Sequence, residues 1–331
     1  QWKLGRTSMG VEFRNEGVRS NVLGKPMKEP QDVPFEKEGQ YLKSDNRSNI
    51  SYFLEHNVLL RRFTLSVGVL ANYNSALNEG IHFYPGIDAS YRIGDNFRLY
   101  GSWNRALRMP TFTDLYYEGK TNKGNPDLKP EESEAFEVGL KYNTYFLRAH
   151  IAGFYRKGKN MIDWVKEKPE DIWESQNLTK VDNLGFETNL SLLPRELGNE
   201  RFFIRKIELG YAFIHQDKDS EGYISNYALD YLKHKFTAQL SHSIWKGFSA
   251  TWYVRWQDRA GSYTKYENLK PAYEEPYAPY CLVDMKVNWE YQRLNLYAEL
   301  NNLLNSTYYD LGNIPQPGIW FKAGFRYSFK Y

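Results

Sequence analysis

The feature that most constrains the fold of this chain is a two-residue alternation of apolar and polar side chains that recurs along its whole length. Within residues 248–256 every second side chain is apolar, and Ser249, Thr251 and Arg255 lie between them. The same alternation occurs in three further segments, 63–73, 294–300 and 319–331. Successive side chains of a β-strand point to opposite faces, so each segment is expected to be a strand with one apolar and one polar face.

These segments are about ten residues long or longer, roughly twice the mean strand of soluble proteins. A tilted strand needs ~9–11 residues to cross a bilayer. About fourteen such segments occur, and they begin near residues 2, 47, 61, 81, 96, 132, 145, 178, 203, 231, 247, 277, 292 and 318. Strands of this length with one apolar face predict an all-β transmembrane β-barrel, in which every second residue faces lipid.

The connections between the segments alternate in length. Short turns occur at 93–96, 143–144, 246–247 and 290–292. Longer polar connections occur at 15–46, 107–131, 157–177, 217–230, 260–276 and 304–317. The connection 74–80 is shorter than the other long ones, and 193–202 is longer than the other short ones. Up-and-down membrane barrels have short periplasmic turns and longer outer loops, so the strands are expected to form an antiparallel up-and-down barrel.

The composition agrees with a membrane barrel and excludes several other classes. The mean hydropathy is -0.67, and no run approaches the ~20 apolar residues of a transmembrane helix, which a barrel does not require. The net charge is only +3 and the basic residues are scattered, so nucleic acid is not an expected partner. Cys281 is the only cysteine and the six His form no HExxH pattern, so neither a disulfide, a metal site nor a cofactor is expected.

A large soluble β-sandwich or propeller is the main alternative fold, because such proteins also contain alternating strands. The packed core of such a protein needs turn signals every ~8–12 residues. The alternating segments of this chain are too long for that spacing. Aromatic residues also gather at the strand ends, as at Trp103, Tyr142, Trp245, Trp289 and Tyr331. This position suits the interfacial aromatic girdles of a membrane barrel.

Two motifs in the segment 101–142 indicate a family. The first motif consists of Arg108, Pro110, Phe112, Asp114 and Leu115. The second consists of Asn125, Pro126, Leu128, Lys129, Pro130, Glu131 and Glu132. Later matching residues are Gly185 and Glu187, Asn301 and Asn302, and the aromatic tail that ends in Tyr331. In type and order these residues resemble the C-terminal barrel portion of TonB-dependent outer-membrane receptors, from about residue 60 onward.

The motif residues also have structural interpretations. Pro110, Pro126 and Pro130 lack an amide donor, so they are expected to end strand pairing and shape a loop. Gly185 is expected to leave room where another group approaches its strand closely. The connection 107–131 is expected to fold over the mouth of the barrel.

The resemblance implies a receptor larger than residues 1–331. Family members have an N-terminal plug domain, a short TonB-contacting box and a twenty-two-stranded barrel, so this chain is expected to be the C-terminal part of such a barrel. The implied location is the outer membrane of a Gram-negative bacterium. The implied partners are membrane lipid, the N-terminal plug and barrel fragment, TonB through the box, and a surface lipoprotein in part of the family.

The resemblance also implies TonB-dependent import of a scarce ligand. The modest loop lengths favour cobalamin over a ferric siderophore or haem. Ligand contacts are expected from aromatic loop residues, because rings bury much apolar area at low entropic cost, although each could instead stabilise its loop. The candidates are Tyr116, Tyr117, Trp164, Trp173, Tyr223, Tyr227, Tyr263, Tyr266 and Tyr308.

Two alternatives belong to other functional classes. A self-contained fourteen-stranded passive channel or fatty-acid transporter would close on these strands alone and would need no TonB. A barrel protease or lipase would need a catalytic cluster at the top of a strand. His215 lies near Asp217 and Asp219 in sequence, but no nucleophile is matched to them, so the chain is not expected to be an enzyme.

Overall fold

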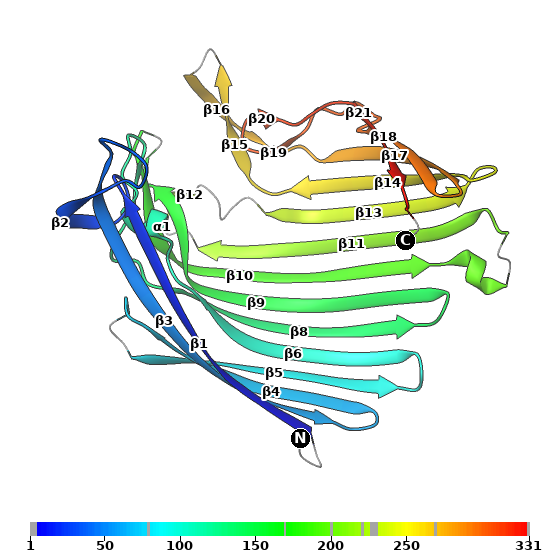
Figure 1. The fold of residues 1–331 in the computed structure, drawn as a ribbon, viewed down its shortest axis with the longest axis horizontal. Helices are drawn as coiled ribbons and strands as arrows, with labels where there is room; N and C mark the ends of the chain where they lie inside the picture. The colour runs from blue at the N-terminus through cyan, green and yellow to red at the C-terminus, as the bar shows by residue number, and fades with distance from the viewer. Residues whose placement is uncertain are drawn as a thin grey trace.

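Long antiparallel strands form one continuous curved sheet in the computed structural model (Figure 1). The structure describes residues 5–77, 80–168, 170–198, 201–219, 222–225, 231–267 and 270–329. In these residues the sheet has seventeen strands, of which fourteen follow one another as neighbours and three short ones, β2, β7 and β12, attach at their ends. The predicted fourteen-stranded antiparallel architecture is confirmed.

The fourteen wall strands pair in chain order, each antiparallel to the next. They are β1 (Gly5–Ser20), β3 (Gln40–Leu59), β4 (Phe63–Asn74), β5 (Ile81–Ile93), β6 (Phe97–Arg108), β8 (Glu131–Asn143), β9 (Leu147–Lys166), β10 (Trp173–Leu192), β11 (Ile204–Asp219), β13 (Leu232–Ser243), β14 (Phe248–Arg259), β17 (Tyr280–Tyr291), β18 (Leu294–Asn301) and β21 (Trp320–Tyr327).

The remaining elements lie in the connections. They are β2 (Lys25–Asp32), β7 (Asn122–Lys123), β12 (Ile224–Ser225), β15 (Ser262–Glu267), β16 (Lys270–Pro276), β19 (Tyr309–Leu311), β20 (Ile314–Pro315), helix α1 (Phe112–Tyr116) and the 3-10 turn η1 (Pro194–Leu197). All except η1 lie at one end of the sheet, in the longer connections, and this end corresponds to the predicted outer side. No helix in the described part of the chain is long and apolar enough to cross a bilayer.

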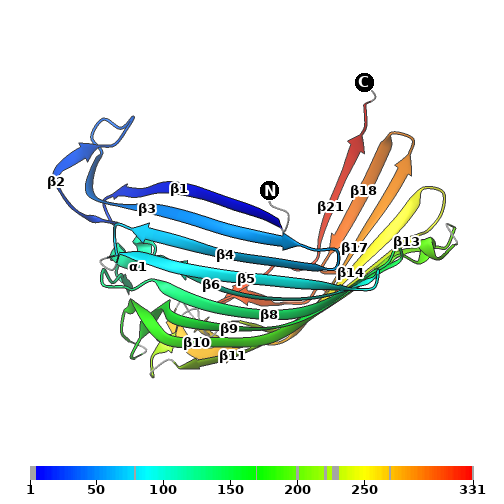
Figure 2. The same cartoon turned by 90° about the horizontal axis from the view of Figure 1, so that it is seen from below.

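The sheet is a trough rather than a closed cylinder (Figure 2). Its two edges are β1 and β21, and no pairing joins them within the described ranges. In Figure 2 both edges stand on the open side of the trough. The fourteen strands therefore do not close on themselves.

The pairing register separates an apolar from a polar face, as the alternation predicts. Leu99, Leu140 and Ile151 are cross-strand neighbours, so they share one face across β6, β8 and β9. One position away, Lys141 pairs with His150, and both line a groove on the concave side. Large apolar side chains on the other face are exposed, with Phe325 at 74%. Such a face is stable only against an apolar medium such as lipid.

Two of the predicted loops, 15–46 and 157–177, are shorter than expected. The strands beside them continue past the alternating segments: β1 extends to Ser20, β3 begins at Gln40, β9 extends to Lys166 and β10 begins at Trp173. Backbone pairing continues there although the apolar alternation has stopped, because a strand that rises above the bilayer has no lipid-facing side. Trp164 and Trp173 therefore lie in strands and not in a loop.

Gly185 occupies a position of close approach in β10, as its sequence context predicts. The ring of Phe154, on the neighbouring strand β9, lies where a side chain would begin: a Cβ atom would be 2.5 Å from the ring and would also meet the Phe213 carbonyl. The same arrangement recurs where the ring of Tyr100 covers Gly139. An aromatic ring packed over a strand glycine compensates for the missing side chain.

Gly185→Ala is therefore expected to lower the free energy of unfolding by about 2 kcal/mol, because the added methyl overpacks a filled site. Urea unfolding of the receptor in detergent, followed by tryptophan fluorescence, measures this change. Gly153→Ala on β9 is the matched control, since a Cβ atom there would lie 4.0 Å from the Gly185 carbonyl oxygen, an ordinary contact distance. Equal effects of the two substitutions would contradict the close-approach role of Gly185.

Candidate functional site

The connection between β6 and β8 begins with a short capped helix. The Thr111 hydroxyl accepts a hydrogen bond from the Asp114 amide at 3.1 Å, and the Asp114 carboxylate accepts one from the Thr111 amide at 3.0 Å. This reciprocal capping box satisfies amide donors at the start of α1. The first family motif therefore specifies the start of a single helical turn.

Helix α1 is held against β3, which is three strands away from β6. The Arg47 guanidinium donates to the Pro110 carbonyl at 2.6 Å and lies 5.0 Å from the centre of the Phe112 ring. The Tyr116 hydroxyl donates to the Asp45 carboxylate. Burial, together with this hydrogen bond, raises the pKa of Tyr116 above its usual value. These contacts carry the connection from β6 across to β3, and its fold over the mouth of the barrel stays a prediction.

The second family motif forms the return of the same connection. The Asn177 side chain on β10 accepts a hydrogen bond from the Lys129 amide at 2.8 Å and donates to the Lys129 carbonyl at 2.9 Å. The Asn125 side chain accepts from the Asp127 amide at 2.9 Å, which forms the turn around Pro126. Leu128 is buried. These residues hold the loop and show no unsatisfied group directed at a ligand.

The two motifs are joined by an ion pair between the strand ends. Arg108 at the end of β6 donates two hydrogen bonds to Glu131 at the start of β8, at 2.5 and 2.6 Å. Glu131 also accepts the Ile162 amide of β9 at 2.8 Å, and its side chain is only 9% exposed. Arg108 and Glu131 thus close the base of the loop and connect it to β9.

The candidate ligand residues separate into two groups. On the β9–β10 side, Tyr117 meets Trp164 edge to face with ring centres 6.5 Å apart, and the Lys166 ammonium lies 4.5 Å from the centre of the Trp173 ring. Tyr116 is directed away toward β3 by its bond to Asp45. Tyr223 lies beside β12 and is half-buried.

The second group lies between the loops after β14 and β18. Tyr263 packs against Tyr277 and stacks with Tyr309, with both centre distances 5.1 Å. Tyr308 packs against Tyr280 at 4.6 Å. Tyr263 and Tyr277 are buried, so this cluster joins two loops to each other.

Charged groups support the Tyr263 cluster. The Lys265 ammonium lies 5.4 Å from the centre of the Tyr309 ring and 2.9 Å from Glu275. The hydrogen bond with Glu275 raises the pKa of Lys265, and the same contact lowers the pKa of Glu275. Burial, then a hydrogen bond to Glu275, raises the pKa of Tyr263. The loop after β14 therefore supplies both the cation, Lys265, and the anion, Glu275, that support the Tyr263 cluster.

Exposure distinguishes candidates that can reach a ligand from those that cannot in this conformation. Tyr266 is 54% exposed and Tyr117 is 38% exposed, whereas Trp164 and Tyr263 are buried. Tyr227 lies outside the described residues, as does the motif residue Tyr331. Tyr277, Tyr280 and Tyr309 are the cluster members that the sequence analysis missed. The signal that could have found them is the density of tyrosines in the two connections.

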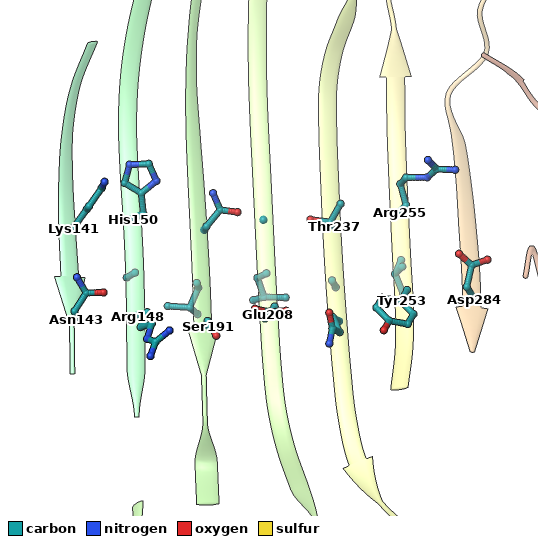
Figure 3. Close-up of a pocket in the computed structure, with 18 residues that line it drawn as sticks. Lys141, Asn143, Arg148, His150, Ser191, Glu208, Thr237, Tyr253, Arg255 and Asp284 are labelled. Atoms are coloured by element: carbon teal, nitrogen blue, oxygen red, sulfur yellow. The ribbon is translucent and has the colours of Figure 1, made fainter. Parts of the chain in front are cut away.

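The concave wall carries a groove of about 660 Å³, shown in Figure 3. Its labelled side chains come from seven neighbouring strands, β8 to β17, and include Lys141, Arg148, Glu208, Arg255 and Asp284. Apolar residues such as Leu190, Leu209 and Val254 also line the groove, so it can contact both polar and apolar parts of a ligand.

A hydrogen-bonded chain crosses the same wall. The Tyr100 hydroxyl lies 2.7 Å from both the Glu137 carboxylate and His150 Nε2, and His150 Nδ1 lies 3.8 Å from Glu187. The hydrogen bonds link β6, β8 and β9, and the motif residue Glu187 on β10 lies beside this network, too far from His150 for a hydrogen bond. Among the side chains that the structure describes, no three His, Cys, Asp or Glu are grouped in a way that could hold a metal ion.

The motif residue Asn302 anchors the loop between β18 and β21. Its side chain donates to the Ser306 and Pro317 carbonyls at 2.9 and 3.2 Å and accepts the Ser306 amide at 2.9 Å. Asn302 is 3% exposed and has a left-handed backbone, with φ at 51°. Asparagine tolerates this conformation better than most residues. The neighbouring motif residue Asn301 ends β18.

Asn302→Ala is expected to cost about 2 kcal/mol of unfolding free energy, because three buried hydrogen bonds are lost in a strained conformation. Asn301→Ala is the control, since the Asn301 side-chain nitrogen is buried and has no hydrogen-bond partner among the described residues. Urea unfolding compares the two variants. A larger loss for Asn301→Ala than for Asn302→Ala would contradict the anchoring role of Asn302.

Comparisons with known proteins agree on the architecture. The family model described as "TonB dependent receptor-like, beta-barrel" matches residues 1–303. The vitamin B12 transporter BtuB of Vibrio vulnificus is 26% identical over 225 residues, covering 51% of this chain and 36% of the relative. The ferrienterobactin receptor of Escherichia coli is 22% identical over 297 residues, covering 81% of this chain and 38% of the relative.

Solved structures give the same fold. A crystal structure of the ferric enterobactin receptor PfeA of Pseudomonas aeruginosa superposes with a TM-score of 0.72 at 19% identity, covering 98% of this chain and 51% of the receptor. The siderophore receptor PirA of Acinetobacter baumannii gives 0.73 at 16% identity, covering 99% and 53%. The chain thus spans about half the length of these solved receptors and little more than a third of the curated relatives.

Proposed function

Because the chain belongs to the TonB-dependent receptor-like β-barrel family, whose model matches residues 1–303, we propose that it is the C-terminal wall of a receptor that actively imports a scarce ligand. The family consists of outer-membrane barrels of Gram-negative bacteria that act as transporters and not as enzymes. Outer-membrane lipid then contacts the apolar face, and the ligand passes on the concave side.

The observation that carries this proposal is the open trough of fourteen strands. Its edges β1 and β21 do not pair in the described residues, and unpaired backbone groups in lipid cost several kcal/mol each. Full receptors of the family have twenty-two strands. We therefore propose that an N-terminal part of the same receptor supplies the missing strands and the plug, and that TonB acts through its box.

The passive-channel alternative is disfavoured by the same observation. A self-contained channel or fatty-acid transporter needs β1 and β21 to pair, and in Figure 2 they stand apart on the open side of the trough. An active receptor does not need this pairing, because other strands of the receptor complete its barrel.

For the ligand we propose cobalamin first and a ferric siderophore or haem second. The similarity to a vitamin B12 transporter supports the first choice, and the structural likeness to siderophore receptors supports the second. We propose Tyr117 and Tyr266 as contact residues at the mouth, because both rings are exposed. A surface lipoprotein remains part of the proposal as a cap over this mouth.

Uptake by cells tests the proposal. The complete receptor is expressed in a strain that lacks its own cobalamin and siderophore receptors, and labelled cyanocobalamin, haem and a ferric siderophore are supplied separately. One ligand should accumulate only when TonB and the proton-motive force are present. Accumulation that persists after addition of a protonophore would instead support a passive channel.

A further inference from the structure

Basic side chains lie directly opposite one another on the concave wall, near the strand ends that carry the short turns. Arg92 of β5 is the cross-strand partner of Arg98 of β6, and Arg98 is the partner of Lys141 of β8. Cross-strand partners share one face of a sheet, and Lys141 lines the concave groove (Figure 3). Arg62 lies beside Arg92, and its carbonyl accepts the Arg92 amide at 2.7 Å. We call these four residues the cationic row.

The cationic row has no counter-charge in the part of the chain that the structure describes. No carboxylate lies within 4.0 Å of its side-chain nitrogens there, including that of Asp95 in the turn between β5 and β6. The turns next to the row, 60–62, 93–96 and 143–146, are described throughout. Lys141 lies over the ring of Tyr100, with its ammonium 4.7 Å from the ring centre.

Four like charges in adjacent positions are unfavourable without a partner. All four side chains are exposed, and neighbouring strands are only ~4.8 Å apart. Like charges directly opposite each other destabilise a sheet. Other cations of the same wall are neutralised, because Glu299 lies 2.7 Å from Lys286 and 2.6 Å from Lys322. The cationic row therefore attracts an anionic partner from outside residues 1–331.

The position of the cationic row indicates what this partner is. The row lies on the concave face, whereas lipid contacts the opposite, apolar face. Repulsion within the row acts at all times, so a partner that stays in place neutralises it better than a scarce ligand that passes. A polypeptide segment with several carboxylates fits this description, because each guanidinium can bind one carboxylate through two parallel hydrogen bonds.

We infer that the cationic row is the docking surface for an acidic segment of the N-terminal part of the receptor, which lies inside the barrel. The segment presents carboxylates to Arg92 and Arg98 and a further one to Lys141. This contact fixes the segment against β5, β6 and β8 near the short turns. The inference rests on the proposed function, which supplies the N-terminal part.

Carbodiimide crosslinking of the complete receptor tests this surface, because the reagent forms an amide only between a lysine amine and a carboxylate in contact. Mass spectrometry of the digested receptor should find Lys141 joined to an Asp or Glu outside residues 1–331. Lys141→Arg keeps the charge and should abolish this link, and Arg98→Lys should add a second link to the same segment. Lys286 and Glu299, 2.7 Å apart, should be joined in every sample and report that the reaction worked.

A second pair of variants tests whether the charges of the row hold the segment. Arg92→Gln/Arg98→Gln is expected to lower the yield of the Lys141 link about tenfold, the effect of losing two partly exposed ion pairs. Arg61→Gln/Lys246→Gln is the matched control, because it removes two exposed positive charges from turns on the same side. This control is expected to leave the yield unchanged.

Three outcomes would overturn the inference. They are a Lys141 that forms no link although Lys286 and Glu299 are joined, a Lys141 that links only to carboxylates within residues 1–331, and equal yields in the two double variants. TonB-dependent uptake by a receptor without the Lys141 link would contradict the inference and leave the proposed function standing. The link in a receptor that imports nothing would do the reverse.

Discussion

Replacing Glu131 by alanine is expected to lower the free energy of unfolding of the receptor by about 3 kcal/mol. The carboxylate accepts two hydrogen bonds from Arg108 and one from the Ile162 amide. Its removal leaves a buried amide without a partner and a guanidinium without its counter-charge. Urea unfolding in detergent, followed by tryptophan fluorescence, measures the loss.

The adjacent glutamate provides the control. Glu132 pairs with Arg105 at 3.3 Å, but both side chains are more than a third exposed. An exposed ion pair contributes only about 0–1 kcal/mol, so Glu132→Ala is expected to change stability by less than about 1 kcal/mol. If Glu131→Ala lowered the free energy of unfolding as little as Glu132→Ala, the ion pair between Arg108 and Glu131 would not be what closes the base of the loop.

Replacing Arg47 by alanine is expected to release α1 from β3. Arg47 is 8% exposed, pairs with Glu16 at 2.6 Å, donates to the Pro110 carbonyl at 2.6 Å and packs on Phe112. Loss of these contacts is expected to lower the free energy of loop opening by about 3 kcal/mol. Hydrogen exchange of the Tyr117 amide, which bonds to Thr113, should then accelerate about a hundredfold.

Arg14 tests whether this effect is specific to Arg47. It pairs with the same glutamate, Glu16, at 3.0 Å, but its side chain is 61% exposed. Arg14→Ala is therefore expected to leave exchange at Tyr117 nearly unchanged. Similar acceleration in both variants would mean that the loop depends on Glu16 and not on the contacts of Arg47 with Pro110 and Phe112.

Much of the fold could be predicted from sequence because lipid imposes a rule on every second residue of a spanning strand. Phe248, Trp252 and Val254 belong to such a series, and β14 runs as that series predicts. The strand ends above the bilayer have no lipid-facing side, so the alternation did not reveal them. In residues 40–46 the apolar Tyr41 and Leu42 are adjacent and the residues after them are polar, so their pairing with β1 and β2 left no two-residue alternation.

The site was less predictable because its contacts join residues far apart in the chain. Tyr263 stacks on Tyr309, and Asn177 binds the backbone of Lys129, although neither pair shows a local pattern. Aromatic loop residues could be recognised as a class, but whether each ring is buried or exposed depends on its neighbour. Tyr263 is buried by such a partner, whereas Tyr266, three residues later, is exposed.

The central claim is that successive residues of each wall strand meet lipid and water in turn. Single cysteines at positions 250–255 of β14, in a receptor with Cys281→Ser, are labelled with an environment-sensitive fluorophore and exposed to brominated lipid. Quenching should be strong at Ala250, Trp252 and Val254 and weak at Thr251, Tyr253 and Arg255. Uniform quenching, or none, along the six positions would contradict the assignment of this chain as a membrane barrel wall.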